Sequence, residues 1–239
     1  MEFENKVAIV TGAAVGIGKA TATQLATGGA SVMLVDINEE ALKAVADELT
    51  AKGYTVAFEA CDVSCEQRVR EVVAKTVELY GKVDILVNNA GVYFGEGEFT
   101  SQSSDMWKRL IDINILGTMY FTHAVLPLMK EQKYGRIVNL GSVAAVYGIA
   151  YMISYSMTKG AIHTFTKALS KEAAPYGITI NTVAPGNIHE DINSNPEMSF
   201  LGRSGTPKEC AEVICYLASD RASYVTGQSY QVDGGRKVM

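Results

Sequence analysis

The sequence lacks the features that mark several other classes of protein, beginning with a basic surface. It contains no run of Lys and Arg, and its 26 acidic residues outnumber its 21 basic ones, for a formal net charge of -5. A protein that binds nucleic acid needs a concentrated basic face to neutralise phosphates. The composition therefore predicts no nucleic-acid partner.

Patterns of metal ligands and of secretion are also absent. Cys61 and Cys65 have no matching Cys/His pair at zinc spacing, and the three histidines form no HxxxH pair, so we expect no metal site. No basic segment followed by an apolar stretch opens the chain, so we expect no secretory signal. The four cysteines are then expected to be reduced thiols in a cytoplasmic protein.

One uncharged stretch, residues 137–158, is long enough to suggest a membrane span. Asn139, Gly141, Ser142 and Gly148 interrupt it, and its apolar runs are short. We interpret it instead as a buried strand, a loop and the start of a helix, and we expect no association with a membrane.

What the sequence does contain is an alternation of short apolar runs with longer amphipathic segments. Segments such as 39–52 and 66–80 repeat apolar residues at three- and four-residue spacing, as helices do. The apolar runs are typical of strands buried on both faces, and they occupy residues 7–10, 31–35, 55–58, 83–87, 136–140 and 178–183. This order predicts an α/β fold with a doubly wound parallel sheet and helices on both faces. The length of 239 residues suits one large domain as well as two small ones.

Glycines follow the first predicted strand, at the end of the sheet where such folds bind ligands. Gly12, Gly16 and Gly18 lie between that strand and a helix that we expect from about Lys19. Glycines there permit a tight turn and close approach of a pyrophosphate, and the helix N-terminus offers free N–H groups. A glycine pattern alone is a weak signal, but its position favours a dinucleotide site.

An acidic residue, Asp36, ends the second predicted strand. Its carboxylate can accept hydrogen bonds from both hydroxyls of an adenosine ribose, and it would repel a 2′-phosphate. Position 15 is Val, so the glycine turn offers no guanidinium for that phosphate. Alone, Asp36 could equally begin a loop, but together with the glycine turn it predicts NAD rather than NADP.

The third and fourth predicted strands also end in polar residues. Asp62 follows the third, where it could accept a hydrogen bond from the adenine amino group. Asn89 follows the fourth, and its neighbours Ala90 and Gly91 leave room for a ribose. We favour a cofactor contact for Asn89, with a purely structural tie between strand ends as the alternative.

Candidates for a reacting centre follow the fifth predicted strand. Ser142 comes just after it, and Tyr155 and Lys159 share one face near the start of a long predicted helix. A secondary alcohol must lose a proton as hydride leaves its carbon, and a free tyrosine, with a pKa of about 10, is a poor base at neutral pH. A neighbouring ammonium can lower that pKa by about one to three units, and Ser142 can hold the substrate oxygen near the phenol.

Taken together, these motifs resemble the classical short-chain dehydrogenase/reductase family over essentially the whole chain. The motifs are Thr11-Gly-x-x-x-Gly-x-Gly, Asn88-Asn-Ala-Gly, Asn114, Ser142, Tyr155-x-x-x-Lys159, Pro185-Gly186 and Val232-Asp-Gly-Gly. The resemblance implies a single Rossmann-type domain over residues 1–239. Its cofactor half would be about 1–135, and its catalytic and substrate-lid half about 136–239. It also implies a homotetramer, or else a homodimer.

The resemblance assigns roles to individual residues. Tyr155 would be the general acid/base, and Lys159 would hold the nicotinamide ribose and lower the tyrosine pKa. Ser142 would position the substrate, and Asn114 would support a water chain that reaches Lys159. The implied cofactor contacts are Gly12, Val15, Gly16, Ile17, Gly18, Asp36, Ile37, Asp62, Val63, Asn89, Ala90, Gly91, Tyr155, Lys159, Pro185, Gly186 and Ile188.

The chain departs from the family pattern after Pro185-Gly186. Glu190 replaces a threonine that often bonds the nicotinamide amide. The lid segment, residues 187–200, is short for the family and rich in Asn, Ser and Pro, which predicts an irregular, mobile loop and an open or unusually shaped pocket. His189 is a candidate substrate contact, although a solvated loop histidine fits better. Further candidates for the pocket wall, with interface packing as an equal alternative, are Tyr93, Tyr147 and Tyr151.

The leading functional hypothesis is an NAD-dependent dehydrogenase for a secondary alcohol, acting on a hydroxysteroid or bile acid, a polyol or sugar acid, or a small diol. The closest rival is a 3-oxoacyl-[acyl-carrier-protein] reductase. Asp36, Val15 and the acidic segment 92–98 argue against that rival, because an acidic carrier protein needs a basic dock. A catalytically inactive dinucleotide-binding protein is a distant alternative, since the set of candidate reacting residues is intact.

Overall fold

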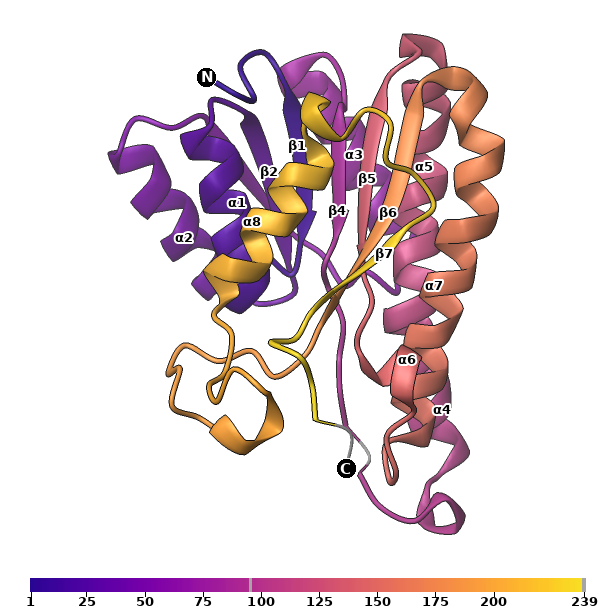
Figure 1. The fold of residues 1–239 in the computed structure, drawn as a ribbon. Coiled ribbons are helices and arrows are strands. Elements are labelled where there is room, and N and C mark those ends of the chain that lie inside the picture. Colours follow the sequence, from indigo (N-terminus) through magenta and orange to yellow (C-terminus); the bar gives the residue numbers. More distant parts are fainter. Residues whose placement is uncertain (95, 238–239) are drawn as a thin grey trace.

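The computed structural model describes residues 1–94 and 96–237. Seven strands form one parallel sheet in the order β3-β2-β1-β4-β5-β6-β7 (Figure 1). The strands are β1 (Val7–Thr11), β2 (Ser31–Asp36), β3 (Val56–Ala60), β4 (Ile85–Asn88), β5 (Gly135–Leu140), β6 (Ile178–Pro185) and β7 (Ser229–Val232). The strand order reverses between β1 and β4, and ligands of such sheets bind beyond the strand ends at that point.

Helices cover both faces of this sheet, which confirms the predicted fold class. One face carries α1 (Gly16–Thr27), α2 (Glu39–Ala51) and α8 (Pro207–Ala218), and the other carries α3 (Glu66–Tyr80), α5 (Gly117–Gln132) and α7 (Ile153–Ala173) (Figure 1). Ala8 and Val10 of β1 enter the first core, while Ile9 between them enters the second. Both faces of the strand are therefore apolar, which is why its sequence is a continuous apolar run.

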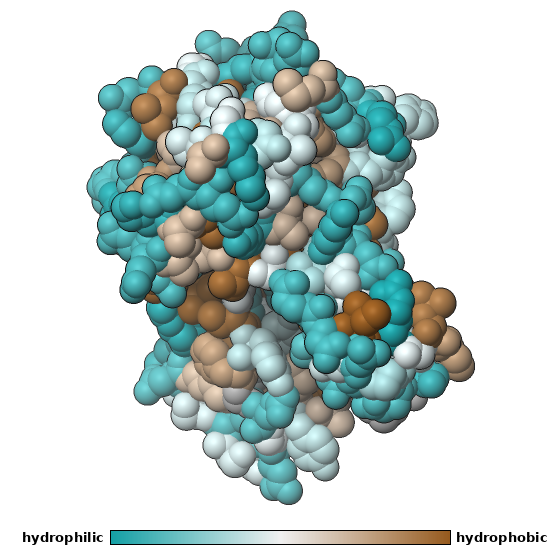
Figure 2. All heavy atoms as spheres, turned by 90° about the vertical axis from the view of Figure 1, so that its left-hand side faces the viewer, coloured by the Kyte–Doolittle hydropathy of each residue, from teal (hydrophilic) through white to brown (hydrophobic). Residues whose placement is uncertain are grey.

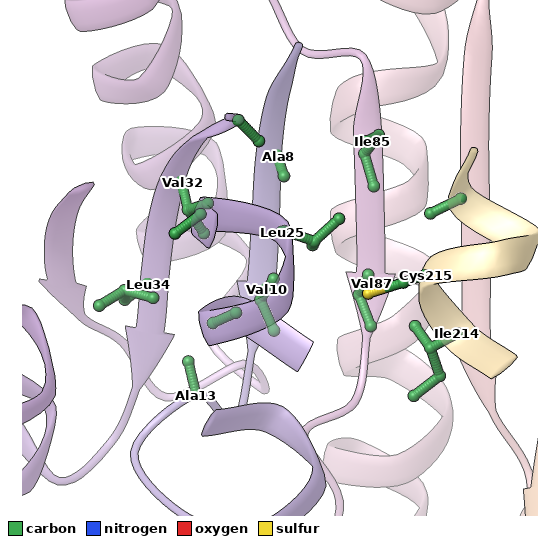
Figure 3. Packing of buried hydrophobic residues seen from close by; sticks show 14 of the residues in the cluster. Ala8, Val10, Ala13, Leu25, Val32, Leu34, Ile85, Val87, Ile214 and Cys215 are labelled. Atoms are coloured by element: carbon green, nitrogen blue, oxygen red, sulfur yellow. The ribbon is translucent and has the colours of Figure 1, made fainter. Parts of the chain in front are cut away.

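The first core shows how the helix carrying the glycine turn is held in place. Leu25 of α1 packs on this face of the sheet. On the same face, Ile214 and Cys215 of α8 lie next to Val87 of β4 (Figure 3). These side chains are buried, so α1 and α8 are fixed against the sheet by apolar packing. The N-terminus of α1 is thereby held at the carboxyl end of β1.

The remaining elements are short. They are α4 (Ser104–Ile111), a π-helix (Asp112–Leu116), α6 (Ala144–Tyr147) and the 3-10 helices Phe99–Ser101, Ala174–Tyr176, Pro196–Met198 and Asp220–Ala222. Within 1–94 and 96–237, no helix has both the length and the apolar character needed to cross a bilayer.

One helix boundary and one strand differ from the sequence-based expectation. α1 begins at Gly16 rather than near Lys19, so Gly16 and Gly18 belong to its first turn. β7 was not predicted at all, because Tyr230 and Gln231 in its centre are exposed and it presents no continuous apolar run. It is recognisable only from its pairing with β6.

Candidate active site

Two adjoining clefts lie beyond the carboxyl ends of the strands. The nucleotide cleft, of about 470 Å³, runs along the ends of β1, β2 and β3 and contains Asp36. The reaction cleft, of about 280 Å³, contains Ser142, Tyr155 and Lys159. Both are lined by Ile17, Asn89, Gly91 and Val92, so they form one continuous depression. Figure 2 looks onto the side that carries α1 and α2, and it shows a hollow bordered by hydrophobic surface.

The glycine turn has the geometry of a pyrophosphate cradle. Gly12 has φ +65°, and a Cβ there would lie 2.7 Å from Asn89 Nδ2. A Cβ on Gly18 would lie 1.9 Å from the carbonyl oxygen of Gly12, so only glycine lets α1 start this close to β1. No side chain caps the N-terminus of α1. Its first N–H groups and the positive end of its dipole are therefore suited to a phosphate.

Asp36 lies at the carboxyl end of β2, in the nucleotide cleft. Its Oδ2 accepts a hydrogen bond from the Ala14 N–H at 3.1 Å, and its Oδ1 accepts one from the Asn38 N–H at 3.0 Å. The exposed side chains of Val15 and Ile37 line the cleft beside it. A carboxylate flanked by apolar side chains can accept hydrogen bonds from ribose hydroxyls and would oppose a 2′-phosphate, so the preference for NAD over NADP stays a prediction.

Asp62 lies in the same cleft, but its carboxylate is already engaged. Its Oδ1 accepts from the N–H and the hydroxyl of Ser64, and its Oδ2 accepts from Arg109 Nη2 at 3.1 Å. Burial raises the pKa of Asp62, but the bonds from Ser64 and Arg109 outweigh it and hold this pKa below its usual value. Asp62 could accept a further hydrogen bond from an adenine amino group only with a lone pair that Ser64 and Arg109 do not occupy. Arg109 of α4 also lines this cleft, which the sequence did not predict.

Asn89 has a structural role, which was the alternative to a cofactor contact. Its Nδ2 donates to the carbonyl oxygens of Thr11 at 2.9 Å and Gly12 at 3.0 Å. The Thr11 hydroxyl in turn accepts from the N–H groups of Asn89 and Ala90. This network fixes the ends of β1 and β4 against each other. Because Asn89 also lines both clefts, its remaining surface faces the depression.

Ser142, Tyr155 and Lys159 meet in the reaction cleft, as their spacing predicted. Tyr155 lies in the first turn of α7 and forms a hydrogen bond with Ser142. Lys159 lies one turn later, where its Nζ donates to the Leu140 carbonyl oxygen at 2.8 Å and sits 5.9 Å from the centroid of the Tyr155 ring. The Ser142 Oγ also accepts from the Ala144 N–H at 3.1 Å, which orients the hydroxyl.

The pKa of Tyr155 in this trio is set by burial and by Ser142. Burial raises the pKa of Tyr155, and the hydrogen bond with Ser142 acts in the opposite direction. Burial also lowers the pKa of Lys159 to about 8, because the ammonium loses hydration. The ammonium lies over the Tyr155 ring and donates to the Leu140 carbonyl oxygen. Further positive charge beside Tyr155, such as an oxidised nicotinamide would add, is needed to favour the phenolate.

Asn114 lies behind this trio, buried in the π-helix. Its Oδ1 accepts from the Val92 N–H at 2.8 Å, and its Nδ2 donates to the Val92 carbonyl at 2.9 Å and to the Thr158 hydroxyl at 3.1 Å. A Cβ on Gly91 would lie 3.2 Å from both Asn114 Oδ1 and Lys159 Nζ. The side chain thus clamps the chain after β4 to the residue that precedes Lys159. A water chain through Asn114 stays a prediction.

The lid segment is irregular, as expected, but it is held by many hydrogen bonds. Asn187 Nδ2 donates to the Ser204 hydroxyl at 2.6 Å and to the Ser194 carbonyl at 3.2 Å. Ile188 lines the reaction cleft together with Pro185 and Gly186, whereas Glu190 borders a separate groove between α1 and α8. His189 is exposed and lines neither the nucleotide cleft nor the reaction cleft, which favours a solvated loop histidine.

The three tyrosine candidates separate in the structure. Tyr93 lines the reaction cleft, and its ring meets that of Tyr155 edge-on, with centroids 5.6 Å apart. Tyr147 and Tyr151 are exposed and do not line it.

Gly18 lines neither cleft and instead allows α1 to pack closely against β1. Lining residues that the sequence analysis missed are Cys61, Val92, Arg109, Ile113, Leu140 and Gly141. Within 1–94 and 96–237, no three His, Cys, Asp or Glu side chains are grouped as metal ligands.

Comparison with known proteins gives consistent matches over nearly the whole chain. A family model described as enoyl-(acyl carrier protein) reductase matches residues 12–237. The 3-oxoacyl-[acyl-carrier-protein] reductase of Thermotoga maritima is 38% identical over 244 residues, which cover 98% of this chain and 99% of that protein. The cyclohexanol dehydrogenase of an Acinetobacter species is 38% identical over 240 residues, covering 98% and 95%.

Solved structures give the same result at the level of the fold. The crystal structure of levodione reductase has a TM-score of 0.90 and 32% identity and covers 97% of both chains. A short-chain type dehydrogenase/reductase from Mycobacterium ulcerans has a TM-score of 0.94 and 29% identity, covering 99% of this chain and 94% of that one. Both similarities extend over the sheet and over the elements that carry Ser142, Tyr155 and Lys159.

Proposed function

This chain belongs to the classical short-chain dehydrogenase/reductase family, and we propose that it is an NAD(H)-dependent oxidoreductase that interconverts a secondary alcohol and a ketone. The observation that carries the proposal is the continuous depression that joins Asp36 to Tyr155. An extended dinucleotide with its adenosine at Asp36 would present its other end to the reacting hydroxyls. The family membership and the site together support an enzyme rather than an inactive dinucleotide-binding protein.

Different side chains of the site would bind the cofactor and transfer the proton. The glycine turn and the N-terminus of α1 would hold the pyrophosphate, and Asp36 the adenosine ribose. When bound, the reduced cofactor supplies a hydride to the carbonyl carbon of the ketone. Ser142 donates a hydrogen bond to the substrate oxygen, and Tyr155 donates the proton that completes the alcohol. In the reverse direction, Tyr155 takes that proton from the alcohol.

Lys159, whose ammonium lies over the Tyr155 ring, would support this proton transfer. Its Nζ keeps one hydrogen bond to Leu140 and retains donors for a ribose hydroxyl. A pKa of about 8 means that the amine can both bind and release a proton near neutral pH. We therefore infer that Lys159 holds the ribose and passes protons to Tyr155 through it.

A second candidate function is the reduction of a 3-oxoacyl group on an acyl carrier protein. The name of the Thermotoga maritima relative and the description of the family model favour it. The exposed Glu96 and Glu98, on the segment that follows Tyr93, disfavour an acidic carrier protein at the mouth of the reaction cleft.

By resemblance to the family, we also infer that the protein is a cytoplasmic homotetramer or homodimer. Sedimentation of the purified protein can test the oligomeric state.

Separate titrations with NADH and NADPH test the cofactor assignment. Because Asp36 opposes a 2′-phosphate, we expect NADH to bind at least about tenfold more tightly, a difference of about 1.4 kcal/mol. Cofactor fluorescence would measure both dissociation constants at one ionic strength. Tighter binding of NADPH would contradict the proposed role of Asp36 and would favour the carrier-protein reductase.

A further inference from the structure

The reaction cleft offers few charged partners to a substrate. Among the described residues that line it, Lys159 is the only charged one, and its buried Nζ is bonded to Leu140. Asn89 is tied to Thr11 and Gly12 through its amide nitrogen. The hydroxyls in the cleft are those of Ser142, Tyr155 and the half-exposed Tyr93. A carboxylate or phosphate on the substrate would lose water here without gaining a free charged partner.

Tyr93 supplies a flat wall directly beside the reacting phenol. Its ring meets Tyr155 at an interplanar angle of 68°, in an edge-to-face arrangement. Tyr93 is 53% exposed and lines the cleft, so its ring is accessible to a bound substrate. The apolar side chains of Val92, Leu140 and Ile188 also line the cleft. This wall favours a substrate with a rigid apolar body next to its reacting carbon.

The chain that carries Tyr93 is anchored on both sides. On one side, Asn114 bonds both the N–H and the carbonyl of Val92. On the other, Gln102 Nε2 donates to the Gly97 carbonyl, while its Oε1 accepts from Trp107 Nε1 at 3.1 Å and from the Ser154 hydroxyl at 2.6 Å. Ser154 immediately precedes Tyr155, so this wall is bonded to the helix that carries the reacting residue.

The charges near the mouth of the cleft disfavour anions. Glu96 and Glu98 are exposed on the segment that bears Tyr93, which lines the reaction cleft. A substrate with its own negative charge would meet a field of the same sign as it approaches. The charge on this segment and the scarcity of charged partners inside the cleft thus both favour an uncharged substrate.

We propose that Tyr93 determines specificity, and that the substrate is an uncharged ketone or alcohol whose reacting carbon lies in or beside an alicyclic or aromatic ring that packs against Tyr93. This proposal rests on the proposed function and deepens it. A ring suits a wall of fixed position, because it loses little conformational entropy on binding compared with a flexible chain. Sugar acids and carrier-bound acyl chains fall outside this class.

The test compares three ketones in steady-state kinetics with NADH. Cyclohexanone represents the uncharged ring, acetone the same carbonyl without the ring, and the acetoacetyl thioester of N-acetylcysteamine the carrier-bound chain. For the wild-type enzyme, we expect the highest kcat/KM for cyclohexanone. A higher kcat/KM for the thioester would overturn the substrate class. No turnover of any ketone with NADH would instead overturn the proposed function itself.

Two variants isolate the contribution of Tyr93. Tyr93→Phe keeps the ring and is expected to leave kcat/KM for cyclohexanone within about twofold, while Tyr93→Ala is expected to lower it about tenfold, mainly through KM. The Ala variant should change kcat/KM for acetone by less than about threefold, because acetone has no ring to lose contact. An equal loss for both ketones, carried by kcat, would show that Tyr93 only positions Tyr155. Since Tyr93 is half exposed, circular dichroism of the Ala variant should match the wild type.

Discussion

Tyr155→Phe is expected to lower kcat for both directions of the reaction by about 1,000-fold, the contribution typical of a positioned general acid or base. The variant removes one hydroxyl and keeps the ring, so its packing against Tyr93 and beneath Lys159 is retained. Binding of NADH should change by less than about threefold, because the proposed cofactor contacts lie mainly on the glycine turn, Asp36 and Lys159. Steady-state kinetics and cofactor fluorescence would measure the two quantities separately.

The matched control is Tyr224→Phe, since Tyr224 is fully exposed and distant in the sequence from every proposed site residue. It should leave kcat unchanged.

The pH dependence of the wild-type kcat provides a second test of Tyr155. Burial holds the pKa of Tyr155 above its usual value, so alcohol oxidation, which needs the phenolate, should rise with pH, and ketone reduction, which needs the phenol, should fall at high pH. If Tyr155→Phe retains a substantial part of kcat, then Tyr155 is not the acid/base.

Asp36→Asn should remove most of the preference for NADH over NADPH. The change keeps the size of the side chain and an oxygen that can accept from Ala14 or Asn38, but it removes the charge that opposes a 2′-phosphate. We expect the ratio of the two dissociation constants to change by about 30- to 100-fold, because ribose bonds to a charged acceptor weaken while the repulsion disappears. Parallel titrations with both cofactors would measure the ratio.

The companion variant is Val15→Arg, which adds a guanidinium at an exposed position on the wall of the nucleotide cleft. In combination with Asp36→Asn it should favour NADPH, because a phosphate then gains a charged partner. Thermal unfolding of each variant would show whether the loop after β2 is intact. An unchanged cofactor ratio in a folded Asp36→Asn variant would mean that Asp36 does not contact the adenosine ribose.

The parts of the site that follow from local sequence were predictable. Asp36 ends a continuous apolar run, and Tyr155 and Lys159 are one helical turn apart, so their positions follow from strand and helix periodicity. Strands buried on both faces have a strong apolar signal, which explains why β1, β2, β4, β5 and β6 were found. The half-buried edge strand β3 was found from its apolar residues Val56, Ala57 and Phe58. β7 lacks that signal because its central side chains are exposed.

The parts that depend on contacts between distant segments were not predictable. Asn114 clamps Val92 and Thr158, and Arg109 reaches Asp62 from a separate helix. Nothing in the spacing of these residues indicates the pairing. The choice of Tyr93 over Tyr147 and Tyr151 as a wall residue likewise follows only from the direction of the chain after β4. The π-helix that presents Asn114 also has no simple sequence period.

Transfer of deuterium from NADH that carries deuterium at both positions of its reactive carbon would test the central claim most directly. The enzyme would be incubated with cyclohexanone and the labelled cofactor in ordinary water, and the product alcohol would be analysed by mass spectrometry and NMR. The account predicts one deuterium on the carbon that bears the new hydroxyl, and loss of this product in Tyr155→Phe. An alcohol without deuterium, or deuterium at any other carbon, would contradict direct hydride transfer between the nicotinamide and the substrate in this site.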